Sequence, residues 1–562
     1  MNRLYGPPAA VVAGVVLLAT FSFVPLRKTE FLGDDHPIVR QNTVVRSGDY
    51  RSMLTKPYWW GVGGNDTTLY RPVTLASFAV QRDPGGQVDP HRARRVNVVL
   101  HVVCSVLLYA LARRAGAATH TAAVAAWLFA AHPIHVAAIA PLVGRADVLA
   151  LGFMLLAALL QAGSFARLPD VAARWLSAGC TLAALGSKES AIAGPLIVAA
   201  VELAARPRGG AAVPAWLRGR LAALIPTALA VLAWIALRAH ATGGWSAVPV
   251  VPVSENPLAA AGGIGRWGTA LAVLTRYLGL LAFPRTLSGD YSGNVIPLES
   301  AWYAPRVLLG AAALVVLAAS SLAPFVRRER TAVSSGSARW SWSLAAWLFL
   351  FPYLVISNLL VPVGMLFAER FAYAPSAGFC LLAALAVTTA VARLAPAPRA
   401  ATLAIAIGAV AAAAGSWRSN VESRHWITDE SLHARVLHSQ PASPRAAFTL
   451  GMIRLQQGRE QEAVDLFRRA IDNYPSFSAA WFEIGKIHLR GGRLAEAAAA
   501  FQQAEQINPY NPEMPMGRGD ALAGLGRWQE AAEAYRAAAK LGYPGAAQRQ
   551  ALAESRAAAP RP

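Results

Sequence analysis

The chain has 562 residues, of which 55% are hydrophobic and 15% charged, a balance typical of multi-pass membrane proteins. Its net charge is +21, but residues 417–562 hold 18 Lys and Arg against 15 Asp and Glu, so +18 lies in the apolar part. Basic loops between spans set orientation, and this distribution disfavours nucleic acid as a partner. The three cysteines, Cys104, Cys180 and Cys380, all lie in apolar runs and predict no disulfide framework.

Apolar runs that approach the ~20 residues of a membrane span recur through residues 1–416. They cover residues 9–26, 96–112, 121–140, 147–166, 175–187, 190–205, 221–238, 304–324, 343–361, 372–392 and 400–416. The first lacks a small-x-small cleavage site, so we expect a retained anchor rather than a signal peptide. A further stretch, 257–284, contains several glycines and two arginines. It can cross the membrane, re-enter it or lie along its interface.

The distribution of arginines indicates the topology. With the N-terminus inside and 257–284 not crossing, every short inner loop carries basic residues, as the positive-inside rule predicts. They are Arg113, Arg114, Arg167, Arg174, Arg206, Arg208, Arg218, Arg220, Arg327, Arg328, Arg330, Arg339, Arg393 and Arg399. We therefore expect an all-α bundle of about 11 spans, a long outer loop at 27–95 and a C-terminal domain on the outer side.

The same topology places five polar clusters at one membrane face. They are Asp34-Asp35, His132 and His135 with Arg145 and Asp147, Lys188-Glu189, the loop around Asp290, and Glu369-Arg370. Ionisable groups near hydrocarbon are costly, so groups that converge there indicate a functional site. Adjacent carboxylates also repel each other. The Asp pair can therefore bind a cation, accept a proton from a hydroxyl, or form only a solvated turn.

Most of these clusters also have a structural interpretation. Lys188-Glu189, Glu369-Arg370 and Arg145 with Asp147 can form ion pairs between helices, and Asp290 can form a turn. His132 and His135 lack an evident third zinc ligand, and Pro133 disturbs the helix between them. For the two histidines we expect helix capping or hydrogen bonding rather than metal binding.

After Gly415 the composition changes and a 34-residue period begins. The recurring positions are Gly451, Gly485 and Gly519; Gly458, Gly492 and Gly526; Ala463, Ala497 and Ala531; and Phe467, Phe501 and Tyr535. This is the tetratricopeptide period, in which two helices per unit pack closely at small residues. We predict a connecting helix or degenerate repeat at 417–444, three repeats at 445–546 and a tail at 547–562. Such an array binds an extended peptide or caps the membrane domain.

Several motifs in order resemble the TMTC (transmembrane and tetratricopeptide) protein O-mannosyltransferases of the GT-C glycosyltransferase superfamily. The matching stretches are Asp34-Asp35, Leu69-Tyr-Arg-Pro-Val-Thr, His91 with Asn97-Val-Val-Leu-His101, His132-Pro-Ile-His135, Val143-Gly-Arg-Ala-Asp147, Lys188-Glu189, Phe283-Pro-Arg-Thr-Leu-Ser-Gly-Asp290-Tyr-Ser and Ala368-Glu-Arg-Phe-Ala-Tyr-Ala-Pro-Ser-Ala-Gly378. The chain departs from the family at Ala137, where the family usually has Glu, and at Tyr291, where it has Trp.

The resemblance implies a GT-C transmembrane domain at 1–416 that moves mannose from a polyprenyl-phosphate donor to a Ser or Thr hydroxyl with inversion. Asp34 or Asp35 would be the general base. The pair can instead hold a divalent cation such as Mg²⁺ or Mn²⁺, and the resemblance itself does not require a cofactor. Candidates for binding the donor phosphate are Arg71, Lys188, Arg370 and Arg145. Candidates for supporting the site are His132, His135, Asp147, Glu189, Asp290 and Glu369.

Two rival functions stay open at this point. A GT-C enzyme can act on a glycolipid or cell-wall glycan, and a membrane-anchored repeat scaffold needs no catalysis. In the enzyme interpretation the repeats recruit a polypeptide acceptor. Alanine- and arginine-rich usage favours a bacterial inner membrane with the site and repeats on the periplasmic side; an endoplasmic-reticulum protein would have a similar sequence.

Overall fold

The computed structural model describes residues 7–63, 68–163, 168–204, 213–244, 251–326, 333–396 and 399–559. Loop arginines Arg167, Arg206, Arg208, Arg327, Arg328 and Arg330 lie outside these residues. Within them the chain forms helices and no strand; its only β-pairing is an isolated bridge between Arg82 and Val88. The predicted all-α architecture is confirmed. The chain divides into two compact units, 1–252 with 258–289 and 298–432, and 253–257 with 290–297 and 433–562.

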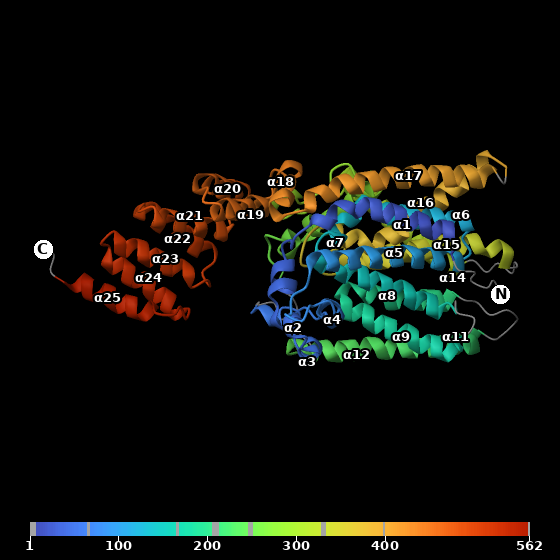
Figure 1. Ribbon diagram of the computed structural model, residues 1–562, viewed down its shortest axis with the longest axis horizontal. Helices are drawn as coiled ribbons and strands as arrows, with labels where there is room; N and C mark the ends of the chain where they lie inside the picture. The colour runs from blue at the N-terminus through green and yellow to red at the C-terminus, as the bar shows by residue number, and fades with distance from the viewer. Residues whose placement is uncertain are drawn as a thin grey trace. The chain divides into compact units, whose positions relative to one another are not determined.

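Unit 1 is a helical bundle (Figure 1). Its long helices are α1 (Ala9–Phe23), α5 (Pro90–Arg114), α6 (Thr119–Ala131), α8 (Arg145–Gln161), α9 (Asp170–Ser187), α10 (Ala193–Ala204), α11 (Val213–Ala223), α12 (Ile225–Thr242), α13 (Gly263–Ala282), α14 (Pro305–Val326), α15 (Val333–Ile356), α16 (Tyr373–Leu394) and α17 (Arg399–Ser423). Short helices α2 (Thr43–Ser47), α3 (Tyr50–Thr55) and α4 (Pro72–Ala79) lie in the first long loop, and α7 (Val136–Ile139) follows α6.

Local sequence explains where the helices begin and end. Helix α5 begins where the Asp89 carboxylate accepts hydrogen bonds from the N–H groups of His91 and Arg92, with Pro90 in the first turn. Helix α6 ends at His132 because Pro133 has no N–H to continue the helical bonding. The chain bends by 45° there, before it resumes as α7.

Seven helical segments in the described residues are long and apolar enough to cross a membrane, or eight if bent α6 and α7 form one span. They are Ala9–Lys28, Pro90–Arg114, Leu142–Gln161, Leu217–Thr242, Pro305–Ala323, Glu369–Leu394 and Arg399–Trp426. This is fewer than the eleven expected. The predicted runs 175–187, 190–205 and 343–361 do form α9, α10 and α15, but these helices are shorter or less apolar in their central window. Figure 1 shows α9 between α8 and α12 with its axis parallel to both.

Helix α13, from the ambiguous stretch 257–284, contacts one loop through two of its side chains. Near its start, Arg266 donates to the carbonyl of Leu360, and towards its end Tyr277 donates to the carbonyl of Ala368. Both partners belong to the loop between α15 and α16. Two positions of α13 therefore contact this loop, and α13 is not among the candidate membrane spans of the described residues.

Unit 2 contains the predicted repeats. Its helix pairs are α19 (Pro444–Gln456) with α20 (Glu460–Asn473), α21 (Ser478–Arg490) with α22 (Leu494–Ile507), and α23 (Glu513–Gly524) with α24 (Trp528–Lys540), followed by α25 (Ala546–Ala558). A Cβ on Gly451, Gly485 or Gly519 would lie 2.5 to 2.9 Å from the aromatic ring sixteen residues later, which explains the paired glycine and aromatic periods. Gly458, Gly492 and Gly526 end the first helix of each pair in the left-handed region, with φ of 75°, 71° and 73°.

Candidate active site

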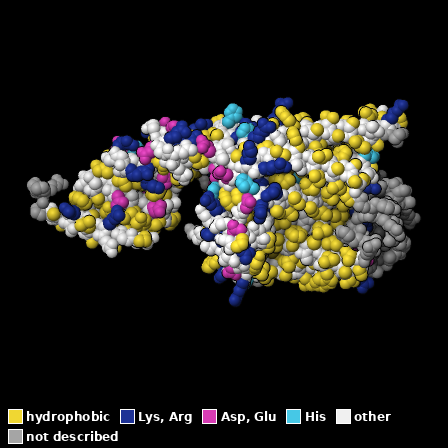
Figure 2. Space-filling model, in the orientation of Figure 1, with side chains coloured by type: hydrophobic (Ala, Val, Ile, Leu, Met, Phe, Trp, Pro, Cys, Tyr) yellow, Lys and Arg dark blue, Asp and Glu magenta, His cyan; other side chains and the backbone are white. Residues whose placement is uncertain are grey.

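Charged side chains gather at the end of unit 1 that carries α2, α3 and α4, whereas hydrophobic side chains cover the flank of the bundle (Figure 2). This end holds four of the five predicted polar clusters: contacts join Asp35 to Val143, Lys188 to Asp147, His132 to Leu281 and Glu369 to Ser288. The fifth, around Asp290, belongs to unit 2.

Asp35 is buried and its carboxylate is fully engaged. One oxygen accepts the N–H of Val143 at 2.9 Å, and the other accepts the N–H of Leu32 at 3.1 Å and lies 3.6 Å from the Arg94 guanidinium. Burial raises the pKa of Asp35 to about 6, while Arg94 and the backbone N–H groups oppose that rise. Through these contacts the buried Asp35 joins the turn that begins at Leu32 to α5 and to the loop before α8.

Asp34, next to it, is exposed. Within the described residues its carboxylate makes no hydrogen bond or ion pair. Asp34 lies near Tyr58: burial raises the pKa of Tyr58, the charges of Asp34 and Glu189 add to this, and Arg71 lowers it. The Arg71 guanidinium lies 5.1 Å from the centre of the Tyr58 ring. The charges of Asp34 and Arg71 therefore both act on Tyr58, and of the two Asp residues only Asp34 is accessible.

Three cations predicted to bind phosphate lie close enough to influence one another. Burial lowers the pKa of Lys188, and the like charges of Arg71 and Arg370 lower it further, against the effect of Asp147. Lys188 is held by Asp147 at 2.6 Å, and Arg71 by Glu189 at 2.9 Å. Arg370 contacts Met365 Sδ at 3.3 Å and the Phe371 ring, and within the described part of the chain it has no carboxylate partner.

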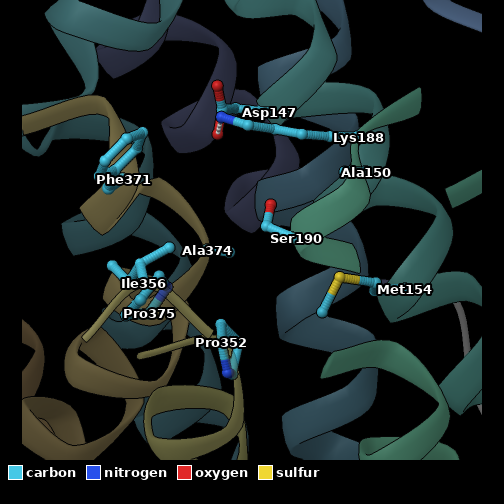
Figure 3. Close-up of a pocket in the computed structure, with 10 residues that line it drawn as sticks. All are labelled: Asp147, Ala150, Met154, Lys188, Ser190, Pro352, Ile356, Phe371, Ala374 and Pro375. Carbon is cyan, nitrogen blue, oxygen red and sulfur yellow. Dashed lines mark hydrogen bonds and ion pairs between the residues drawn. The ribbon is translucent and has the colours of Figure 1, made fainter. Parts of the chain in front are cut away.

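A small pocket opens beside Lys188. Figure 3 shows the Lys188–Asp147 pair and the Ser190 side chain on one side, with Phe371 and Pro375 across from them. Its volume of about 20 Å³ holds about one water molecule, which is too little for a sugar or a phosphate. A phosphate would therefore meet these cations at the exposed edge of the cluster, where Arg370 is partly accessible, rather than inside the pocket.

Arg145, the fourth predicted phosphate ligand, is fully buried. Its guanidinium donates to Asn97 Oδ1 at 2.8 Å and to the carbonyls of Ser77 and Ala93 at 3.0 and 2.7 Å, and it lies over the Phe78 ring. These contacts engage all three of its nitrogens. The geometry supports the structural alternative for Arg145, although its partner is Asn97 rather than the expected Asp147, which pairs with Lys188.

The two histidines of the bent segment are buried in hydrogen-bonded positions. His132 Nδ1 accepts the N–H of Ile134 at 3.3 Å, so Nε2 carries the proton and donates to the Leu281 carbonyl at 2.9 Å. His135 Nε2 lies 2.7 Å from Ser376 Oγ. His132 therefore caps the turn after α6, as the capping interpretation predicted, and binds it to the end of α13.

Glu369 and Asp290 hold loops in different units. Glu369 is buried and accepts the N–H of Ser288 at 2.7 Å. In unit 2, Asp290 accepts the hydroxyls of Ser292 and Ser443, each at 2.6 Å, and Ser443 caps α19. These contacts support the turn-forming interpretation of Asp290.

The two carboxylates of the Asp pair lie in different surroundings. Both Asp35 oxygens accept N–H groups and Asp35 is buried, whereas Asp34 is exposed. Among the residues that the structure describes, no three His, Cys, Asp or Glu residues come together in a way that could hold a metal ion. We therefore derive no step through a divalent cation.

One residue of this region, Asp429, was not predicted from the sequence. Asp429, the first residue of α18 (Asp429–Ser439), accepts the N–H of Gly33 at 2.9 Å and lies 3.3 Å from His36 Nε2. It is separated from the Asp pair by almost 400 residues, and no motif or periodicity marks it.

Known proteins match this chain in two ways. A tetratricopeptide repeat family model matches residues 430–476 and 461–512. The protein O-mannosyl-transferase TMTC1 of Homo sapiens is 28% identical over 481 residues, covering 79% of this chain and 52% of that protein. TMTC3 of Mus musculus is 28% identical, covering 63% and 40%, and Tmtc1 of Drosophila melanogaster is 26% identical, covering 81% and 60%. The chain spans about half the length of these curated relatives. The resemblance seen in the motifs is confirmed over most of the chain.

Proposed function

The chain is a homologue of the TMTC protein O-mannosyl-transferases over most of its length, and from this relationship we propose that it is a membrane mannosyltransferase. The donor is a polyprenyl-phosphate mannose, and the acceptor is a Ser or Thr hydroxyl of a protein. The reaction takes place on the extracytoplasmic side, at the end of unit 1 that holds Asp34, Lys188 and Arg370. The observation that carries the proposal is the accessible Asp34 carboxylate, whose neighbour Asp35 accepts the N–H of Val143, four residues before the Asp147 that holds Lys188.

Asp34 acts as the general base. The acceptor oxygen attacks C1 of mannose, its proton passes to Asp34, and the bond between C1 and the phosphate oxygen breaks, so that polyprenyl phosphate leaves. A hydroxyl is a weak nucleophile, and a positioned base contributes typically ~10²–10⁴-fold to such a step. Asp34 suits this role because it is exposed and engaged by no other described residue, whereas the Asp35 carboxylate is buried and occupied.

Arg370, Lys188 and Arg71 stabilise the departing phosphate. Negative charge grows on the phosphate oxygen as the bond to C1 breaks, and fixed cations lower the barrier most where charge develops. Arg370 is the first contact because its guanidinium, which has no carboxylate partner among the described residues, can donate two parallel hydrogen bonds to phosphate. Lys188 and Arg71 add charge behind it while Asp147 and Glu189 hold them in place.

The occupied carboxylates favour a single displacement with inversion. Retention by double displacement needs a second carboxylate as the nucleophile. Of the other predicted site carboxylates, Asp147 and Glu189 are paired with Lys188 and Arg71, and Asp35 is buried. One accessible base and one leaving phosphate are the groups that an inverting transfer requires.

Unit 2 supplies the argument for a protein acceptor. Tetratricopeptide arrays typically bind extended peptides, so we propose that the repeats recruit the polypeptide whose hydroxyl is modified. A glycolipid acceptor would not need the repeats to bind a peptide. A non-enzymatic scaffold would need neither the exposed Asp34 nor an Arg370 that has no carboxylate partner among the described residues.

The test supplies membranes that contain the intact chain with radiolabelled polyprenyl-phosphate mannose. We expect label in precipitable protein that is released by alkaline β-elimination, and much less label from the corresponding glucose donor. Label confined to the lipid extract would replace the protein acceptor by a glycolipid. Absence of transfer from either donor, in membranes that demonstrably contain the protein, would contradict the proposed enzyme.

A further inference from the structure

The turn that carries Asp34 is held by the carboxylate of Asp429. Oδ1 of Asp429 accepts the N–H of Gly33 at 2.9 Å, and Oδ2 lies 3.3 Å from Nε2 of His36. Gly33 and His36 flank the Asp pair on its two sides. One carboxylate therefore spans the turn and is bonded on both sides of the proposed base.

The same two segments are also joined through their backbones. The N–H of Glu30 donates to the carbonyl of Ile427 at 3.1 Å, so residues 427–429 lie beside residues 30–33, which precede Asp34. Gly33 has a φ of 47°, a left-handed conformation that glycine adopts easily and leaves easily. The bond to Asp429 restrains this glycine, in addition to the turn bonds from the Asp35 N–H to the Leu32 carbonyl at 2.9 Å and from the His36 N–H to the Gly33 carbonyl at 3.1 Å.

The Asp34 side chain depends on that backbone for its direction. Among the described residues it has no hydrogen-bond or ion-pair partner, unlike Asp35, whose carboxylate is held by three groups. An unheld side chain points where its backbone directs it. The contacts made by Asp429 restrain that backbone from the C-terminal side of unit 1, in addition to the bond from the Ile38 N–H to the Asp34 carbonyl at 3.1 Å.

We propose that Asp429 is a positioning residue for Asp34, which fixes the turn so that the base meets the acceptor hydroxyl. This inference rests on the proposed function, because it assigns Asp429 to the reaction through Asp34. Misplacing a reacting group by about 1 Å can cost ~10²-fold in rate, which sets the scale of the expected effect. Asp429 also lies only four residues before the chain enters unit 2 at His433, so the restraint comes from the segment that leads to the repeats.

The first experiment measures mannosyl transfer by Asp429→Ala, Asp34→Asn and the double variant. We expect Asp429→Ala to lower kcat by about tenfold to a hundredfold and to leave KM for the donor within about twofold. In the Asp34→Asn background, the same substitution should have no further effect, because the residue acts through the base. Asp429→Asn, which keeps an oxygen for Gly33, should fall between. The matched control is Asp472→Ala, an exposed carboxylate of unit 2.

The outcomes separate the inference from the proposed function. If Asp34→Asn abolishes transfer but Asp429→Ala and Asp429→Asn match the intact chain, the positioning role is wrong and the enzyme assignment stands. If the double variant loses activity by the product of the two single losses, Asp429 acts independently of Asp34. That result would show a general structural effect and overturn the inference. If Asp34→Asn is fully active, the proposed base is wrong, and the role of Asp429 falls with it.

A second measurement does not depend on transfer. Hydrogen–deuterium exchange of the peptide that contains Gly33 should be faster in Asp429→Ala than in the intact chain and unchanged in Asp472→Ala. If exchange is faster in Asp429→Ala but the intact chain shows no detectable mannosyl transfer, the turn is held as described and the proposed function is wrong. Unchanged exchange would overturn the positioning of the turn, whatever the activity.

Discussion

The Asp35 carboxylate lies 3.6 Å from the Arg94 guanidinium, with both side chains buried, while the adjacent Asp34 is exposed. Arg94 also donates to the carbonyls of Thr29 and Ala140, each at 2.6 Å, and to that of Glu30 at 2.9 Å. Arg94 therefore holds the end of the first membrane segment, the Asp turn and the segment after α7 together. Two neighbouring residues of the same chemistry have separate tasks, one structural and one proposed to be catalytic.

Removing Arg94 should destabilise the protein. Arg94→Ala leaves the Asp35 carboxylate buried without its counter-charge and three carbonyls without a donor, a change that typically costs ~3–5 kcal/mol. Unfolding of the detergent-solubilised protein, followed by heat or denaturant, measures this loss. Asp34→Asn is the control, and we expect a change within ~0.5 kcal/mol because that side chain is exposed. Equal destabilisation by the two variants would contradict the division of roles.

Stability should also respond to the titration of Asp35. Its pKa is raised by burial from 3.8 to about 6, so between these values the folded state binds more protons than the unfolded state. This group therefore favours folding at low pH, and its contribution is lost as the pH rises from about 4 to about 6. Asp35→Asn cannot titrate, so stability measured from pH 4 to pH 7 should fall less with rising pH than in the intact chain. A steeper fall in the variant would mean that the shift has the opposite sign.

Arg370 should govern the affinity for the donor phosphate. We expect Arg370→Ala to raise KM for polyprenyl-phosphate mannose by about tenfold, the scale of one charge-assisted hydrogen bond, and to lower kcat as well, because the same contact stabilises the departing phosphate. Arg370→Lys should restore part of both losses. Because Arg370 has no carboxylate partner among the described residues, its removal leaves no buried charge unpaired. Arg92→Ala, in a side chain that is 75% exposed at the start of α5, should leave KM unchanged. Equal effects of the two substitutions would indicate general attraction by the positive surface.

Helix α13 should have both ends on the same side of the membrane. Single cysteines at Gly262 and Phe283, both exposed, test this in a chain whose three native cysteines are replaced by alanine. A membrane-impermeant maleimide applied to the outer side should label both positions and spare a cysteine at Thr119, which lies beyond the far end of α5. Labelling of only one of the two ends would show that α13 crosses the membrane.

The sequence predicted the features that local patterns encode. Hydropathy and the 34-residue period are local, and they located the apolar helices and the three helix pairs of unit 2. Seven or eight helices of the described residues are candidate spans, against about eleven predicted, because three of the predicted apolar runs form helices that are short or contain polar residues. The sequence could not show that Asp35 is buried and Asp34 exposed, since the partners of Asp35, Arg94 and Val143, lie far along the chain. Arg145 was ambiguous for the same reason: its partners at Asn97, Ser77 and Ala93 come from other segments.

The most direct measurement compares mannosyl transfer by Asp34→Asn with transfer by Asp49→Asn. Both residues are exposed carboxylates of the same long loop, and Asn can replace Asp49 as the residue that caps α3. If Asp34 is the base, Asp34→Asn should lower kcat at least a hundredfold, within the ~10²–10⁴-fold range of general-base catalysis, while Asp49→Asn keeps nearly full activity. Equal activity of the two variants, with equal amounts of folded protein, would contradict the account.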